Sequence, residues 1–224
     1  MARLLGAEIP NGTSIFMVGP PGAGKTSITI DLSRSLLNRG IPCVYVTLNQ
    51  DPQEVRANIV GSSRNEKAKD MLVLVDGYSW RWGESNEPYR IKSLTNLNDL
   101  TIRFFTACEN IGPKLFFVID SVSNCLIYNS ENEVVRLLDV YMAKARASGH
   151  IGIFMAEEGI HDPSFYKMLY HMADGVIEVN TKDDDTLTRI LRIAKFRGLG
   201  HAPSWHKFHI QNGGVVRIAE KVGR

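Results

Sequence analysis

A glycine-rich segment near the N-terminus contains the side chains best suited to chemistry. It reads Gly19-Pro20-Pro21-Gly22-Ala23-Gly24-Lys25-Thr26 and fits the spacing G-x-x-x-x-G-K-[ST]. Glycines let backbone N–H groups converge on a phosphate, and the N-terminus of a following helix adds a positive partial charge. Lys25 would reach the outer phosphates of a nucleotide, and the Thr26 hydroxyl would ligate Mg²⁺. The residues that we expect to bind ATP are Gly19, Gly22, Ala23, Gly24, Lys25, Thr26 and Ser27.

A second candidate is the aspartate that ends the apolar run Leu115-Phe116-Phe117-Val118-Ile119-Asp120. Such a run is typical of a buried strand, which would present its last side chain at the C-terminal edge of the sheet. We expect this strand to neighbour the strand before Gly19. Asp120 would then face the phosphates and, with Thr26, hold Mg²⁺ directly or through a water. Taken alone, an aspartate at this position would more often cap a helix or close a turn, and it is the phosphate loop that favours the Mg²⁺ role.

Strands and helices must position these residues, and their patterns alternate along the chain. Apolar runs predict strands at Ser14–Val18, Cys43–Leu48, Met71–Val75, Leu115–Asp120, Ile151–Met155 and Val176–Val179. Helical spacing predicts helices at Lys25–Arg39, Pro52–Val60, Asn98–Glu109 and Glu131–Ser148. This order indicates an α/β fold with a mostly parallel sheet flanked by helices. Strands at Leu187–Phe196, Trp205–Ile210 and Val215–Ile218 lack intervening helices and predict a C-terminal antiparallel extension.

Composition narrows the class of protein. The 224 residues are 44% hydrophobic and 22% charged, which excludes a disordered or low-complexity chain. No linker divides the sequence, so we expect one domain over residues 1–224. The net charge of +2 argues against a nucleic-acid coat, and no apolar run is long enough to insert into a membrane. The three cysteines have no metal-ligand spacing and predict buried, reduced thiols in a cytoplasmic protein.

Charge is divided unevenly between the later parts of the chain. Residues 131–186 contain 5 basic and 11 acidic residues, whereas residues 187–224 contain 8 basic and 1 acidic residue. This division suits self-complementary assembly or a basic face for an anion. Neutralisation within one molecule would explain it equally well.

The ordered set of motifs resembles the KaiC-like branch of the RecA-type ATPases. Besides the phosphate loop, the similar segments are Glu8–Gly12, Tyr45–Thr47, Val75–Tyr78, Val118–Ser121, Ala173–Ile177 and Lys195–Gly198. The resemblance implies a RecA-type core that binds ATP and Mg²⁺. It also implies a homo-oligomer, as a hexamer-like ring or a filament, with ATP at subunit interfaces.

In related proteins the Lys-x-Arg element reaches the γ-phosphate held by a neighbouring subunit. The resemblance assigns that role to Lys195 and Arg197, which would project on the same face of an extended strand. Two cations in a basic segment suit a phosphate that is supplied by another subunit. The alternative is an exposed edge strand that charge protects from unwanted pairing.

One departure from the family pattern concerns catalysis. Relatives usually carry paired glutamates just after the second strand, and one of them accepts the proton of the attacking water. Here the position reads Asn49-Gln50, and an amide can orient water but cannot take its proton. Glu54, Glu157 or Glu158 could compensate. We therefore expect tight nucleotide binding and slow hydrolysis, with Lys25, Gln50, Asp120, Lys195 and Arg197 around the reacting phosphate.

An aromatic and basic segment leaves the partner open. Gly77–Lys92 contains two tryptophans and two tyrosines among three basic residues, a mixture that can stack single-stranded DNA. We favour a loop folded onto its own aromatic rings, or a protein contact, because Glu84 and Glu87 dilute the positive charge. We therefore expect a nucleotide-dependent regulator or scaffold with a protein partner. The alternatives are a recombinase-related DNA-binding ATPase and a protein phosphotransferase.

Overall fold

A computed structural model describes residues 9–61, 66–184, 186–201, 203–211, 214 and 216–221. One sheet runs through it in the order β10-β9-β8-β7-β1-β6-β5-β2-β3-β4. The strands are β1 (Ser14–Gly19), β2 (Cys43–Thr47), β3 (Leu72–Asp76), β4 (Tyr89–Arg90), β5 (Phe116–Asp120), β6 (Ile151–Glu157), β7 (Gly175–Asp184), β8 (Thr186–Phe196), β9 (His206–Ile210) and β10 (Val216–Lys221). Pairing is parallel from β7 to β4 and antiparallel from β7 to β10. Both predicted parts of the sheet are therefore confirmed.

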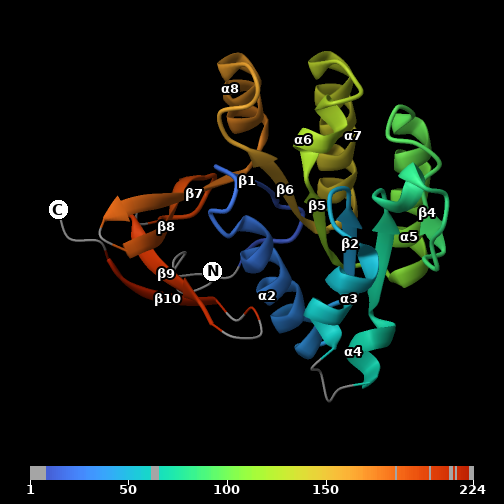
Figure 1. Cartoon of the computed structure of the whole chain (residues 1–224), viewed down its shortest axis with the longest axis horizontal. Helices are drawn as coiled ribbons and strands as arrows, with labels where there is room; N and C mark the ends of the chain where they lie inside the picture. The colour runs from blue at the N-terminus through green and yellow to red at the C-terminus, as the bar shows by residue number, and fades with distance from the viewer. Residues whose placement is uncertain are drawn as a thin grey trace.

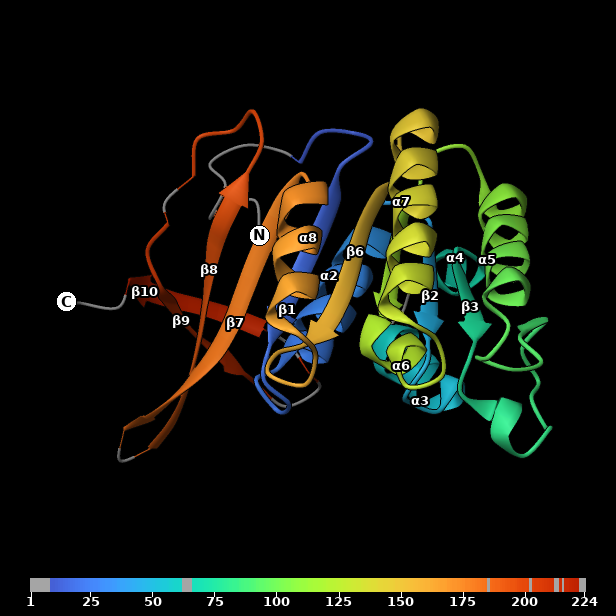
Figure 2. The same cartoon turned by 90° about the horizontal axis from the view of Figure 1, so that it is seen from above.

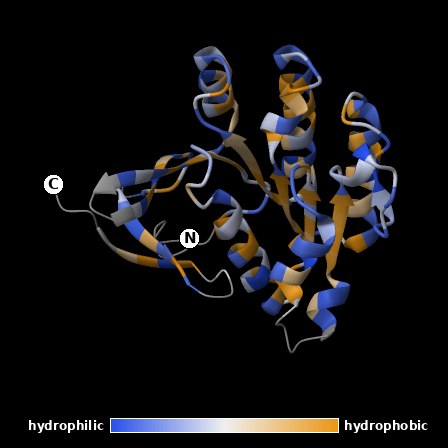
Figure 3. Ribbon diagram, in the orientation of Figure 1, coloured by the Kyte–Doolittle hydropathy of each residue, from blue (hydrophilic) through white to orange (hydrophobic). Residues whose placement is uncertain are grey.

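Helices cover both faces of the parallel part, as Figures 1 and 2 show. They are α2 (Lys25–Asn38), α3 (Pro52–Val60), α4 (Glu66–Asp70), α5 (Leu97–Ile111), α6 (Val122–Leu126), α7 (Glu131–Ser148) and α8 (Pro163–Met172). Side chains alternate along β1, so that Phe16 and Val18 pack with α5, α7 and α8, while Ile15 and Met17 pack with α2 and α3. The central strands are the most hydrophobic part of Figure 3, as burial on both faces requires.

The sheet order corrects one expectation. β5, which ends at Asp120, is not the neighbour of β1, because β6 lies between them. Consequently Glu157, the last residue of β6, lies between the phosphate loop and Asp120 along the sheet edge. Patterns of apolar residues identify strands but do not contain their spatial order, so this arrangement was not predictable from them.

Other differences concern elements with weak local signals. The helix α8 was not expected, although Asp162 accepts a hydrogen bond from the Ser164 N–H and Pro163 occupies the first turn, both of which are helix-start signals. β7 is longer than predicted and pairs with β8 as a hairpin. All three cysteines are buried and free, as predicted. Burial raises the pKa of the Cys43 and Cys125 thiols to about 12, which keeps them protonated.

Candidate functional site

The phosphate loop joins β1 to α2 and leaves a helix N-terminus open. Gly24 has φ 101° and Gly22 has φ 75°, values that glycine adopts without strain. A Cβ at Gly19 would lie 2.0 Å from the carbonyl oxygen of Val179, so this position also requires glycine. The first turn of α2 has no acidic residue and its N-cap makes no side-chain hydrogen bond. The N–H groups at this end are therefore available for an anion.

Lys25 is the buried cation of the loop. Its side chain is 4% exposed, and Nζ donates to the carbonyl oxygens of Gly19 at 2.7 Å and Pro20 at 2.9 Å. Nζ also forms an ion pair with Oε2 of Glu157 at 2.7 Å. A phosphate that binds Lys25 would therefore either share the ammonium group with the Glu157 carboxylate or displace that carboxylate from it. Ala23, a residue of the loop itself, is buried, and Ser27 lies in the first turn of α2.

Asp120 ends β5 and lies beside Thr26, as predicted. The Thr26 Oγ1 donates to Asp120 Oδ2 at 3.1 Å, and the Tyr45 hydroxyl donates to the same oxygen at 2.8 Å. The other oxygen, Oδ1, is buried and has no hydrogen-bond partner. Burial raises the pKa of Asp120 to about 6, although both hydrogen bonds oppose the shift. A buried carboxylate oxygen without a partner, next to a threonine hydroxyl, suits a hard cation such as Mg²⁺.

Sequence reasoning identified Asp120 but not the groups that hold it. Tyr45 lies on β2, next to β5 in the sheet, and its hydroxyl also contacts Thr29 Oγ1 of α2 at 3.1 Å. The tyrosine therefore links the Mg²⁺-binding candidate to the helix that follows the phosphate loop. A tyrosine inside an otherwise aliphatic strand was the available signal, because a buried phenol needs a hydrogen-bond partner.

A second group of residues fixes Glu157. Its N–H donates to Ser123 Oγ at 2.9 Å, and its carbonyl accepts from the Tyr166 hydroxyl. His161 Nε2 lies 2.8 Å from the same Ser123 oxygen, and burial lowers the pKa of His161. The next residue, Glu158, is exposed, while its N–H donates to the Gly19 carbonyl at 2.9 Å. Of the two glutamates, Glu157 is therefore the one directed to Lys25.

The segment after β2 reaches the same edge of the sheet. The Leu48 N–H donates to the Asp120 carbonyl at 2.7 Å, and Thr47 Oγ1 donates to the Gln50 carbonyl at 2.7 Å. The backbone at Gln50 is thus fixed close to the end of β5, and its side chain is partly exposed. Glu54 lies on α3 and is exposed.

Lys195 and Arg197 lie at the opposite end of the strands from the phosphate loop. Phe196 pairs with Gly175, which pairs with Ile15 at the start of β1, whereas the phosphate loop follows the end of β1. Lys195 Nζ donates to the carbonyl oxygens of Tyr170, His171 and Ala173 at 2.6–3.2 Å. The structure therefore does not bring these cations to the phosphate loop of their own chain, and Lys195 caps the C-terminus of α8.

Arg197 differs from Lys195 in its exposure. Its side chain is 58% exposed, and Nη1 lies 3.3 Å from Oδ1 of Asp174. The same carboxylate oxygen accepts from Arg146 Nη2 at 2.7 Å, so two guanidinium groups share one acidic side chain. Arg197 is therefore the member of the Lys-x-Arg pair that is available to another molecule.

The aromatic segment folds onto itself. The rings of Tyr78 and Trp82 meet edge to face at 5.0 Å, and those of Trp80 and Tyr128 at 5.4 Å. The guanidinium of Arg81 lies 5.3 Å from the Tyr78 ring and 5.5 Å from the Trp80 ring. Most of these rings are engaged within the chain, as the interpretation of a self-packed loop expects.

Among the helices of the described residues, none combines the length and the apolar character that spanning a membrane demands.

Comparisons with known proteins agree with this fold. A family model described as "ATPase: KaiC" matches residues 1–222. The UPF0273 protein PH0284 of Pyrococcus horikoshii is 27% identical over 98% of this chain and 91% of the relative. Circadian clock protein KaiC2 of Synechocystis is 24% identical over 95% of this chain but only 36% of the relative. The solved structure of the KaiC-like protein PH0186 from Pyrococcus horikoshii superimposes with a TM-score of 0.77 at 20% identity, covering 98% of this chain and 95% of that one.

Proposed function

The chain belongs to the KaiC family of ATPases, and from that premise we propose that it binds Mg-ATP, hydrolyses it slowly and acts as a nucleotide-dependent regulator in a homo-oligomer. The observation that carries the nucleotide part is the unpartnered, buried Oδ1 of Asp120 beside Thr26, at the open N-terminus of α2. Thr26 and Asp120 would hold Mg²⁺, which when bound supplies charge neutralisation to the phosphates.

The chain's own residues divide the work at the phosphates. The amides of Gly22 to Ser27 bind the phosphate oxygens and exclude water from them, and Lys25 pairs with the outermost phosphate. Glu157 competes for Lys25, because Nζ holds its carboxylate at 2.7 Å. The lysine is thus positioned before nucleotide arrives and must exchange one anionic partner for another.

Slow hydrolysis follows from the side chains that face the reaction. Gln50 can donate a hydrogen bond to a water or accept one from it, but it cannot remove the proton that the attacking water must lose. A partly buried alternative, Glu157, is occupied by Lys25. Hydrolysis then depends on a base that is either absent or already paired, which favours a long-lived ATP state.

An oligomer is supported by the placement of Arg197. Arg197 lies at the sheet edge away from the phosphate loop, so one subunit could present it to the loop of the next in a head-to-tail ring or filament. Trp82 is exposed but meets the Tyr78 ring edge to face, and Trp80 packs on Tyr128. This packing favours a protein partner over single-stranded DNA.

Nucleotide binding is tested by measuring ATP affinity with and without Mg²⁺. We expect Lys25→Ala to weaken binding by at least about tenfold, the loss of one charge-assisted contact. Asp120→Asn should abolish the gain that Mg²⁺ provides. Lys167→Ala removes an exposed lysine of α8 and serves as the control. Unchanged affinity in Lys25→Ala would reject the site.

A further inference from the structure

A cavity lies away from the phosphate loop, between α5 and α7. Its volume is about 540 Å³, within the range of small-molecule sites. It opens at the N-terminal edge of the parallel strands, because His150 immediately precedes β6 and Phe117 lies near the start of β5. The site already described lies at the other end of these two strands. This cavity is therefore separate from the nucleotide site.

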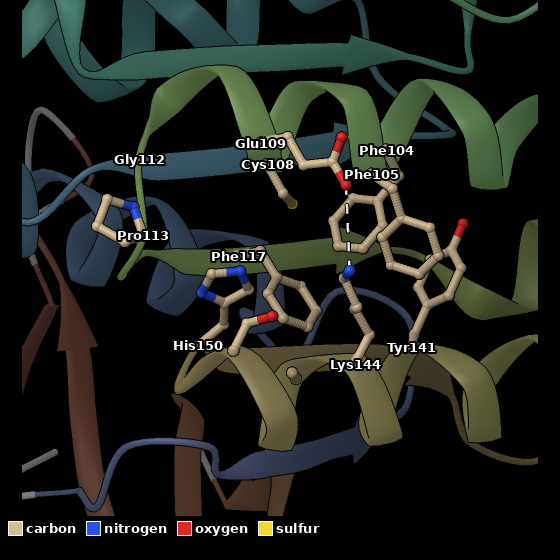
Figure 4. A pocket seen from close by; sticks show the side chains of 12 residues that line it. Phe104, Phe105, Cys108, Glu109, Gly112, Pro113, Phe117, Tyr141, Lys144 and His150 are labelled. Atoms are coloured by element: carbon tan, nitrogen blue, oxygen red, sulfur yellow. Dashed lines mark ion pairs between the residues drawn. The ribbon is translucent and has the colours of Figure 1, made fainter.

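Aromatic rings form one wall of the cavity (Figure 4). Phe104 stacks on Tyr141 with ring centroids 4.6 Å apart and meets Phe117 edge to face at 5.1 Å. Phe117 has room because residue 152 is glycine, where a Cβ would lie 2.1 Å from the ring. The rings thus hold one another in fixed orientations, and Phe105, which packs on Phe104 and Tyr141, is the partly exposed ring of this wall.

One polar group in the cavity lacks a hydrogen-bond partner. His150 is 7% exposed, and its Nδ1 is buried without a partner. Figure 4 shows its imidazole beside the ring of Phe117. Burial, reinforced by the charge of Lys144, lowers the pKa of His150 and so disfavours the charged ring. A buried nitrogen without a hydrogen-bond partner destabilises the folded protein until a ligand or a water donates a hydrogen bond to it.

The mouth of the cavity carries balanced charges. Glu109 Oε1 and Lys144 Nζ lie 4.0 Å apart, and both side chains are exposed. Lys144 Nζ also lies 5.8 Å from the centroid of the Phe105 ring. An exposed pair of this kind contributes little to stability and can separate to admit a molecule. Since the two charges cancel, the mouth favours an uncharged ligand.

We propose that this cavity binds a small, flat, uncharged aromatic molecule whose N–H or O–H group donates a hydrogen bond to Nδ1 of His150. The ring of Phe105, backed by Phe104, Phe117 and Tyr141, supplies the apolar contact, and His150 selects the donor. In the neutral tautomer protonated on Nε2, Nδ1 is an acceptor and lacks only that donor. The proposal does not depend on the nucleotide site.

Indole and 1-methylindole test the proposal as a pair, since methylation replaces the N–H donor with a methyl group, and His150→Phe separates the loss of the donor from the added bulk. Equilibrium dialysis of the full chain against each compound measures the affinities. We expect indole to bind several-fold to about tenfold more tightly than 1-methylindole. His150→Phe, which keeps an aromatic ring, should reduce indole binding to the level of 1-methylindole. Equal binding of the two compounds to the unaltered protein would overturn the proposal.

A filled cavity provides the second test. Ser148→Trp places a large side chain on the lining, whereas Ala147→Trp places it on the exposed surface of the same helix turn. Circular dichroism establishes that each variant is folded. We expect Ser148→Trp to abolish indole binding and Ala147→Trp to preserve it. Indole that binds both variants alike, or that fails to bind the unaltered protein up to its solubility limit, would contradict the assignment.

Discussion

Two charged residues beside the phosphate loop, Lys25 and Asp120, are almost completely buried. Asp120 is 1% exposed and uses one oxygen for Tyr45 and Thr26, while the other has no partner. Its pKa of about 6 means that, without a cation, its ionised form is penalised by the fold. A residue that binds a metal is expected to show this conflict in the metal-free protein.

The pH dependence of stability tests this conflict. The folded-state pKa of Asp120 lies above its unfolded value of 3.8, so the folded form binds the proton more tightly. Stability attributable to this group is therefore present at low pH and lost as pH rises through about 6. Asp120→Asn should stabilise the nucleotide-free protein more at pH 7.5 than at pH 5, by about 1 kcal/mol. Urea unfolding at both pH values measures the difference, and an equal effect at both would contradict the account.

Gln50 tests the missing base. Gln50→Glu places a carboxylate on a backbone that Thr47 already fixes, so it can take the proton of the attacking water. We expect ATP hydrolysis to accelerate by at least about tenfold, toward the contribution typical of a general base. Gln53→Glu makes the same change on the exposed side of α3 and should leave the rate unaltered. An unchanged rate in Gln50→Glu would show that the base lies elsewhere.

At the scale of elements, β8 and α8 depend on one another through Lys195. Its ammonium donates to three carbonyl oxygens at the end of α8, where the helix dipole is negative. Lys195→Met keeps most of the apolar stem but removes these hydrogen bonds. We expect this substitution to lower the free energy of unfolding by about 1–2 kcal/mol. Lys167→Met, at an exposed position of α8, should lower it by less than about 0.5 kcal/mol. Chemical denaturation measures both, and equal effects would argue against the capping role.

The same elements show what sequence reasoning could and could not supply. Continuous apolar runs identified β1, β2, β3, β5 and β6, because strands that are buried on both faces need apolar side chains throughout. The order of the strands was not available, so Glu157 appeared only as a residue near the phosphate edge. Lys25 pairs with Glu157 because β6 lies between β1 and β5, and this strand order belongs to the tertiary structure rather than to any local pattern. Likewise, no local pattern distinguishes a lysine that reaches another subunit from one that caps α8.

At the scale of the whole molecule, Arg197 and the phosphate loop occupy opposite edges of the sheet. If ATP lies between subunits, a chain that lacks Lys25 and a chain that lacks Arg197 can complete one another. We expect the Lys25→Ala chain and the Arg197→Ala chain each to hydrolyse no ATP when assembled alone. An equal mixture should recover about a quarter of the active interfaces of a head-to-tail assembly. Failure of the mixture to exceed its components, after exchange of subunits, would contradict this arrangement.

The central claim is that the chain holds ATP for a long time before cleaving it. Single-turnover hydrolysis of Mg-ATP, at protein concentrations high enough for assembly, tests it most directly. We predict that ATP binds tightly and stays intact for many minutes. Cleavage of the bound ATP at about 1 s⁻¹ or faster, within the ordinary range of enzymes, would contradict the account and identify a working base that replaces the family's glutamate.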